Sequence, residues 1–212
     1  MSNKAKITTF WSAKGGVGKT TLAVAQAITL AKEKEKVVIL DFNEVTPHIH
    51  KILGLKLMDW TEVYNAIEQE SITIDTIRPY LQNKHGTWVL SGVSLREFDR
   101  FQEKHFSAII QVLESEFSHV IIDCNAGIFF ASTLAALKNS DEVKVVTAPT
   151  KVCVEDTAMF LDFIQNSWGV EMEKIELVLN MVRRDGVEPE NLKALFGKVK
   201  TIKYDPTAIK LQ

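Results

Sequence analysis

The chain has 212 residues, of which 46% are hydrophobic and 25% charged, a composition typical of one globular domain with a sizeable core. Its net charge of −2 gives no electrostatic reason to expect DNA or an anionic membrane as a partner. The two cysteines, Cys124 and Cys153, lack metal-ligand spacing, so a disulfide framework or cysteine-held metal is not expected. Because the sequence contains neither a signal peptide nor a long apolar run, we expect a cytoplasmic protein, with recruitment to the nucleoid, membrane or cell pole left open.

Short apolar runs alternate with longer helix-patterned stretches along the chain. Strands are predicted at residues 7–11, 37–40, 88–90, 120–122, 143–147, 175–179 and 199–202. Helices are predicted at residues 20–32, 60–68, 101–117, 132–137, 154–166 and 189–196. This alternation indicates βαβ units, so we predict an α/β fold with a doubly wound, mainly parallel sheet flanked by helices. Ligands of such sheets bind beyond the carboxyl ends of the strands.

A glycine-rich loop follows the first predicted strand. It reads Ala13-Lys14-Gly15-Gly16-Val17-Gly18-Lys19-Thr20-Thr21. Glycines let backbone N–H groups converge on phosphate oxygens, and the N-terminus of the following helix favours negative charge. In such a loop Lys19 contacts the β- and γ-phosphates and Thr20 offers its hydroxyl to Mg²⁺. We therefore predict that Lys14, Gly15, Gly16, Val17, Gly18, Lys19, Thr20 and Thr21 form a nucleotide site, although Ala13 stands where the general motif has glycine.

Carboxylates follow two further predicted strands, and an amide follows a third. Asp41 comes after the run VVIL, Asp123 after HVII, and Asn180 after IELVL. Each side chain would lie at the ligand edge of a parallel sheet. A helix cap or a turn is the alternative role for all three residues.

The stretch KGGVGKT resembles the deviant Walker A loop of the ParA/MinD ATPases, a branch of the P-loop NTPases that includes the nitrogenase iron protein. The resemblance extends over the chain, so residues 1–212 are expected to form a single ATPase domain of nitrogenase iron protein-like fold. It implies that Lys14 acts in trans on the phosphates of a partner subunit and that Lys19 acts in cis. It also implies ATP and Mg²⁺ as cofactors, a homodimer formed with ATP, and an activating or cargo protein as a further partner.

Other positions match the family residue by residue. Asp123 matches the Walker B aspartate and, with Thr20 and Asp41, makes up the implied metal site. Asn180 matches a residue that contacts the adenine edge. Asp205 and Pro206 match a turn that flanks the base. Family members usually continue past this turn through further helices, so we expect those helices to be missing here, through natural shortness or truncation.

One departure concerns catalysis. The family has a second aspartate two residues after Asp41, and this chain has Asn43. An amide can orient the attacking water but cannot take its proton, so hydrolysis is expected to be slow. Two interpretations stay open: an ATPase that dwells in its ATP-bound dimer, or a substitution made to trap that dimer. The residues with predicted catalytic roles are Lys14, Lys19, Asp41 and Asn43.

The leading functional hypothesis is a ParA/MinD-type ATPase that positions or partitions cargo such as a plasmid, a chromosome, or the division, pilus or flagellar apparatus. The segment at residues 80–123 also resembles pilus-assembly (CpaE/TadZ) and flagellar-number (FlhG) relatives. Two alternatives remain. Asn43 favours a non-hydrolysing nucleotide-binding interaction module, and relatives with the same loop include metallochaperone-type ATPases, which tend to carry paired interface cysteines.

Overall fold

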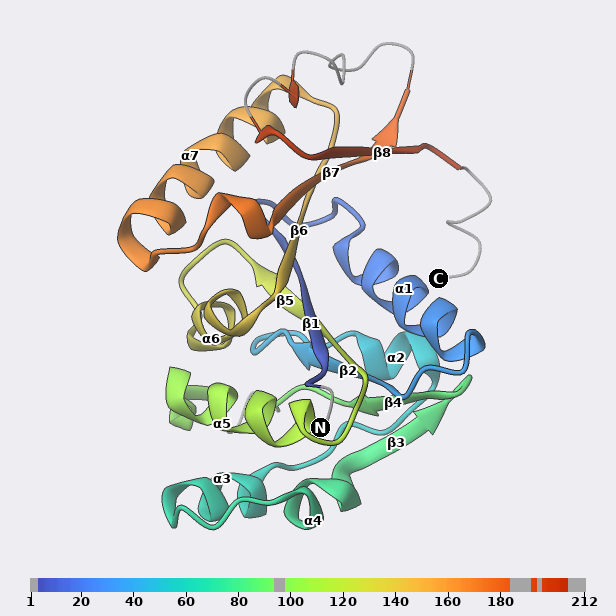
Figure 1. Cartoon of the computed structure of the whole chain (residues 1–212), viewed down its shortest axis with the longest axis vertical. Coiled ribbons are helices and arrows are strands. Elements are labelled where there is room, and N and C mark those ends of the chain that lie inside the picture. The colour runs from blue at the N-terminus through green and yellow to red at the C-terminus, as the bar shows by residue number, and fades with distance from the viewer. Residues whose placement is uncertain (1–3, 94–97, 184–191, 194–195, 206–212) are drawn as a thin grey trace.

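A single twisted sheet organises the protein (Figure 1). The computed structural model describes residues 4–93, 98–183, 192–193 and 196–205. Within them eight strands hydrogen-bond in the order β3-β4-β2-β5-β1-β6-β7-β8, and every neighbouring pair is parallel except β3 and β4. The bounds are β1 (Lys6–Ser12), β2 (Val37–Phe42), β3 (Leu81–Lys84), β4 (Thr87–Leu90), β5 (His119–Ala126), β6 (Glu142–Thr147), β7 (Ile175–Val182) and β8 (Val199–Lys203).

Helices cover both faces of the sheet, as predicted. On one face lie α1 (Lys19–Lys32) and α2 (Ile49–Leu53), and on the other lie α3 (Thr61–Glu68), α4 (Ile74–Ile77), α5 (Glu103–Glu114), α6 (Ala131–Asn139) and α7 (Lys151–Trp168). The part of the chain that the structure describes also contains three short 3₁₀ turns: η1 (Arg78–Tyr80), η2 (Phe98–Arg100) and η3 (Met172–Lys174). None of the helices that the structure describes has the length and hydropathy needed to cross a bilayer.

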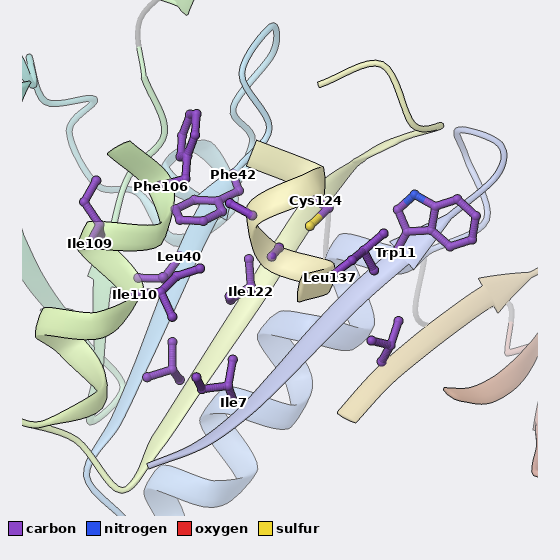
Figure 2. Close-up of a cluster of buried hydrophobic side chains, with 14 of the residues drawn as sticks. Ile7, Trp11, Leu40, Phe42, Phe106, Ile109, Ile110, Ile122, Cys124 and Leu137 are labelled. Atoms are coloured by element: carbon purple, nitrogen blue, oxygen red, sulfur yellow. The ribbon is translucent and has the colours of Figure 1, made fainter. Parts of the chain in front are cut away.

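The core consists of two apolar layers separated by the sheet. Along β2, Val38 and Leu40 face the larger layer while Val37 and Ile39 face the smaller one, because successive side chains of a strand point to opposite faces. Figure 2 shows part of the larger layer, where side chains of β2, β5 and α5 meet. Burying one such aliphatic side chain contributes about 1.5–3 kcal/mol. Both faces of the central strands are covered, which explains why their sequences show no polar alternation.

Seven of the eight strands were predicted from the sequence, and β3 was not. Its residues LQNK are half-buried or exposed at the sheet edge, so they carry no apolar run. β3 pairs antiparallel with β4 through a turn in which His85 and Gly86 have φ angles of 51° and 81°, a geometry typical of two-residue hairpins. Two short helices, α2 and α4, were also missed. The helix predicted at 189–196 lies mostly outside the described residues.

Candidate nucleotide-binding site

The glycine-rich loop lies between β1 and α1, at the carboxyl edge of the sheet. Gly16 and Gly18 have φ angles of 77° and 87°, in the left-handed region that side-chain-bearing residues avoid. A Cβ atom at Gly18 would lie 2.4 Å from the amide nitrogen of Asn180, whereas a Cβ at Gly15 or Gly16 would have no protein atom within 4 Å. Gly18 is therefore needed for packing. Gly15 and Gly16 leave an open surface of backbone, which is the shape that a phosphate group requires.

Beside this open loop, the structure brings Lys19, Thr20 and Asp123 together. The Lys19 ammonium lies 3.1 Å from Oδ1 of Asp123, and its side chain is only 8% exposed. The Thr20 hydroxyl donates a hydrogen bond of 2.6 Å to Oδ2 of the same carboxylate. A buried lysine next to hydroxyl and carboxylate oxygens fits an anionic ligand together with a hard cation such as Mg²⁺. These three predicted residues therefore form one cluster.

Asp41 lies on the neighbouring strand, opposite Asp123 in the β2–β5 register. Its Oδ2 accepts the backbone N–H groups of His48 (2.8 Å) and Ile49 (2.9 Å), and its Oδ1 accepts that of Asn43 at 3.2 Å. Burial and the nearby Asp123 raise the pKa of Asp41 to about 7, while the three backbone donors oppose this shift. The carboxylate thus stabilises the start of α2 in this geometry, and its contact with a metal stays a prediction.

Asn43 is half-buried and belongs to a turn that follows β2. Its Oδ1 accepts a hydrogen bond of 3.0 Å from the backbone N–H of Thr46 and a longer one from the hydroxyl of that residue. This is the local bonding that asparagine commonly makes in turns. Its proposed role in orienting water remains a prediction.

Lys14 is bound within its own chain. Its Nζ lies 2.6 Å from Oδ2 of Asp156 on α7, and the two side chains are 40% and 34% exposed. The hydrogen bond to Asp156 raises the pKa of Lys14. Lys14 therefore belongs to an ion pair separate from the Lys19–Asp123 cluster, and an action in trans stays a prediction.

Asn180 contacts the phosphate loop directly. Its Nδ2 donates a hydrogen bond of 2.8 Å to the carbonyl oxygen of Val17, and the residue is only 7% exposed. The end of β7 therefore holds the loop in place. An amide nitrogen carries two hydrogens, so this contact is compatible with the predicted contact to adenine, which stays a prediction. Asp205 is exposed, and Pro206 lies outside the described residues.

Two residues of the site region were missed by the sequence analysis. Glu44 is 4% exposed, and its Oε1 accepts the backbone N–H of Ser132 on α6 at 2.7 Å. The indole N–H of Trp11 donates to the carbonyl oxygen of Gly127 at 2.7 Å. For Glu44 the one available signal in the sequence was an acidic residue directly after Asn43. Neither Glu44 nor Trp11 is close in sequence to the residue that it bonds.

A mainly parallel sheet with an open glycine loop and a buried lysine–carboxylate cluster at its carboxyl edge defines a P-loop nucleotide-binding protein. A family model described as an AAA domain matches residues 5–177. The chain belongs to this family, that of the ParA/MinD-type P-loop ATPases.

Individual relatives agree with this assignment. The septum site-determining protein MinD of Synechocystis is 28% identical over 179 residues, which are 84% of this chain and 65% of that protein. The chain thus spans just under two thirds of the length of this relative. Two solved structures share the fold: MinD of Pyrococcus horikoshii complexed with Mg-ADP (TM-score 0.78, 20% identity, 98% of this chain and 89% of that chain), and a ParA family ATPase of Chlorobium tepidum (TM-score 0.83, 18% identity, 99% and 88%).

Proposed function

We propose that this protein binds ATP and Mg²⁺ and hydrolyses ATP slowly, and that its ATP-bound homodimer positions or partitions a cellular cargo. The observation that carries the proposal is the contact of Lys19 and Thr20 with the two oxygens of Asp123 beside the open backbone of Gly15 and Gly16. The names of the relatives, which concern septum placement and ParA-type ATPases, support the positioning role.

Lys19 and Thr20 have defined parts in this proposal. The Lys19 ammonium would move from Asp123 to the β- and γ-phosphate oxygens, where it stabilises the charge of the transferred group. The Thr20 hydroxyl and the Asp123 carboxylate would hold Mg²⁺, Thr20 directly and Asp123 through water. Bound Mg²⁺ supplies neutralisation of charge on the phosphate oxygens. The solved MinD structure with Mg-ADP supports this choice of ligand.

Slow turnover follows from Asn43. Attack of water on the γ-phosphorus breaks its bond to the bridging oxygen and yields ADP and phosphate, and the water must lose a proton. The Asn43 amide can orient this water but cannot accept that proton. A phosphate oxygen is then the remaining acceptor, which makes the step slower than with an aspartate in this position.

Dimerisation follows from Lys14. A second cation at the entrance of a loop that already has its phosphate lysine is explained by action on the nucleotide of a second subunit. ATP would shift the population toward the dimer only if the γ-phosphate interacts better with that state than with the monomer. An activating or cargo protein would then recognise the dimer in the cytoplasm.

A second candidate function is a nucleotide-binding interaction module that does not hydrolyse ATP, and Asn43 favours it. A metallochaperone has less support, because Cys124 is buried in the core, Cys153 is half-buried on α7, and the two cysteines are not paired in the sequence. Calorimetric titration with ATP and ADP plus Mg²⁺, together with phosphate release, tests the proposal. Binding with slow release supports it, binding without release favours the interaction module, and no binding contradicts both.

A further inference from the structure

Glu44 is a buried carboxylate beside the nucleotide site. It directly follows Asn43 and is 4% exposed, although an ionised carboxylate placed in an apolar region without partners costs several kcal/mol. Burial raises the pKa of Glu44, and hydrogen bonds from Ser132 oppose that shift. A buried carboxylate with such a free-energy cost requires a specific hydrogen-bond partner.

That partner is the start of α6. Oε1 of Glu44 accepts the backbone N–H of Ser132 at 2.7 Å. The first turn of α6 contains no acidic residue of its own, and a helix N-terminus has unpaired N–H groups and a partial positive charge. The loop after β2 therefore supplies the carboxylate that stabilises this helix end.

Further bonds join the same two segments. The Ser132 hydroxyl donates to the carbonyl oxygen of Phe42 at 2.9 Å, and Nδ2 of Asn125 donates to that same oxygen at 3.2 Å. The Phe42 ring is fixed in the core against Phe106, with 4.9 Å between ring centroids (Figure 2). Residues 42 and 44, which flank Asn43, are thus tied to residues 125 and 132.

The segment between residues 125 and 132 is also held at Gly127. The backbone N–H of Gly127 donates to the carbonyl oxygen of Ser12 at 2.9 Å, and its own carbonyl oxygen accepts the Trp11 indole N–H. One loop follows β2, which carries Asp41, and another follows β5, which carries Asp123. The loop after β5 is held at both ends, because β1 bonds Gly127 and Glu44 bonds Ser132.

We propose that Glu44 is a positioning residue for ATP hydrolysis, which fixes the loop carrying Asn43 relative to the loop that follows Asp123. The inference rests on the proposed function, since it concerns the same nucleotide site. Glu44 acts through its hydrogen bond to Ser132 and touches neither the phosphates nor the metal. When the distance between these two loops is fixed, Asn43 and the residues that would hold the metal keep the arrangement that hydrolysis requires.

Three variants test this. Glu44→Ala removes the acceptor, and Glu44→Gln keeps an oxygen for the Ser132 N–H while removing the charge. Glu176→Ala is the matched control, because Glu176 is a partly buried carboxylate that bonds Lys144 at 2.8 Å away from the nucleotide site. Turnover is measured with Asn43 and with Asn43→Asp, so that a slow wild type does not hide the effect.

Glu44→Ala is expected to lower kcat about tenfold, the value of one positioning hydrogen bond, and to leave the Kd for ATP within about twofold. Glu44→Gln is expected to restore most of kcat, and Glu176→Ala to behave as wild type. A fall in ATP affinity that matches the fall in kcat, or a Glu44→Gln variant as slow as Glu44→Ala, would overturn the proposal.

Amide exchange of the nucleotide-free protein separates this inference from the proposed function. Glu44→Ala should speed exchange in residues 43–48 and 127–134 together, whereas Glu176→Ala should not. Unchanged exchange in either segment would overturn the role of Glu44 even if ATP binds. If the wild type binds no ATP, the proposed function fails and the positioning role fails with it, whatever the exchange shows about the link between the two loops.

Discussion

Lys14 and Asp156 form a direct ion pair in which Nζ lies 2.6 Å from Oδ2. The pair joins the phosphate loop to α7. In the proposed dimer Lys14 would have to leave Asp156 to contact the nucleotide of a second subunit, so this carboxylate would compete with dimerisation. The competition is modest, because both side chains are more than a third exposed and such pairs are screened by water and salt.

The first prediction concerns this pair. Lys14→Ala should abolish the ATP-dependent dimer and leave ATP binding largely intact, whereas Asp156→Asn should lower the protein concentration for half-dimerisation by about twofold to fivefold. Mass by light scattering in ATP and Mg²⁺ measures both effects. Lys151→Ala is the control, since Lys151 is an exposed lysine on α7 that pairs with Glu155. If Lys14→Ala loses ATP binding instead, the lysine acts in cis.

The second prediction concerns Asn43. Asn43→Asp should raise phosphate release by about tenfold to a hundredfold, because a carboxylate can take the proton of the attacking water. Asn43→Ala controls for loss of the turn that the Asn43 side chain makes with Thr46, and should stay as slow as the wild type or slower. Equal rates for Asn43 and Asn43→Asp would mean that this position does not limit hydrolysis.

The third prediction concerns the hold of β7 on the phosphate loop. Asn180→Ala removes the hydrogen bond to the Val17 carbonyl oxygen and should weaken binding of ATP and ADP about tenfold, equivalent to roughly 1.4 kcal/mol. Asn166→Ala is a matched control on the exposed part of α7. A greater loss for ATP than for GTP would support the contact with adenine. Unchanged affinity of Asn180→Ala for ATP and for GTP would contradict both the support of the loop and the contact with adenine.

The fourth prediction concerns Mg²⁺. Thr20→Val keeps the shape of the side chain but removes the hydroxyl that lies 2.6 Å from Asp123, so it should remove the dependence of ATP affinity on Mg²⁺. Titrations with and without a chelator measure this dependence. Thr29→Val is the control, because it removes a hydroxyl of the same helix that bonds only a backbone carbonyl oxygen. This variant should keep the dependence of ATP affinity on Mg²⁺. A Thr20→Val variant with full Mg²⁺ dependence would place the metal elsewhere.

The fifth prediction is a pH dependence of stability away from the site. Hydrogen bonds from Lys104 and His105 lower the pKa of Glu68 from 4.5, and the Nδ1 atom of His105 accepts the Gln102 N–H, which leaves Nε2–H as the donor to Glu68. A lowered carboxyl pKa stabilises the fold above the unfolded-state value, and this contribution disappears as the pH falls through the folded-state pKa.

Urea unfolding between about pH 3 and pH 6 measures this contribution. Glu68→Gln should lower the unfolding midpoint at the upper end of the range and flatten the dependence on pH, while Glu33→Gln, an exposed control, should follow the wild type. Parallel curves for Glu68→Gln and the wild type would show that Glu68 is not the titrating group.

The cluster of Lys19, Thr20 and Asp123 can be predicted from the sequence, because the loop motif places the first two residues and a strand ending places the third. The sequence also predicts the sheet, since both faces of the central strands are apolar. It does not show the partner of Lys14, because Asp156 lies on a distant helix and exposed ion pairs leave no pattern. Glu44 was missed for the same reason, since its partner is 88 residues away.

For some residues a sequence motif specifies the position but not the bonds that the side chain makes. Asp41 lies at the predicted strand end, yet its oxygens bond backbone N–H groups at the start of α2. Asn180, predicted to contact the adenine edge, donates a hydrogen bond to the Val17 carbonyl oxygen of the phosphate loop. Short polar side chains at strand ends bond whichever backbone groups the fold brings near. The sequence places such a residue at the ligand edge of the sheet, but it does not show whether the side chain bonds a ligand or the backbone.

The proposed ATP-dependent dimer can be tested through the mass of the protein in solution. Light scattering would be recorded with ADP and then with ATP, each with Mg²⁺, at one protein concentration. We predict a monomer of 23.9 kDa with ADP and twice that mass with ATP. The same mass with both nucleotides would mean that ATP does not drive dimerisation.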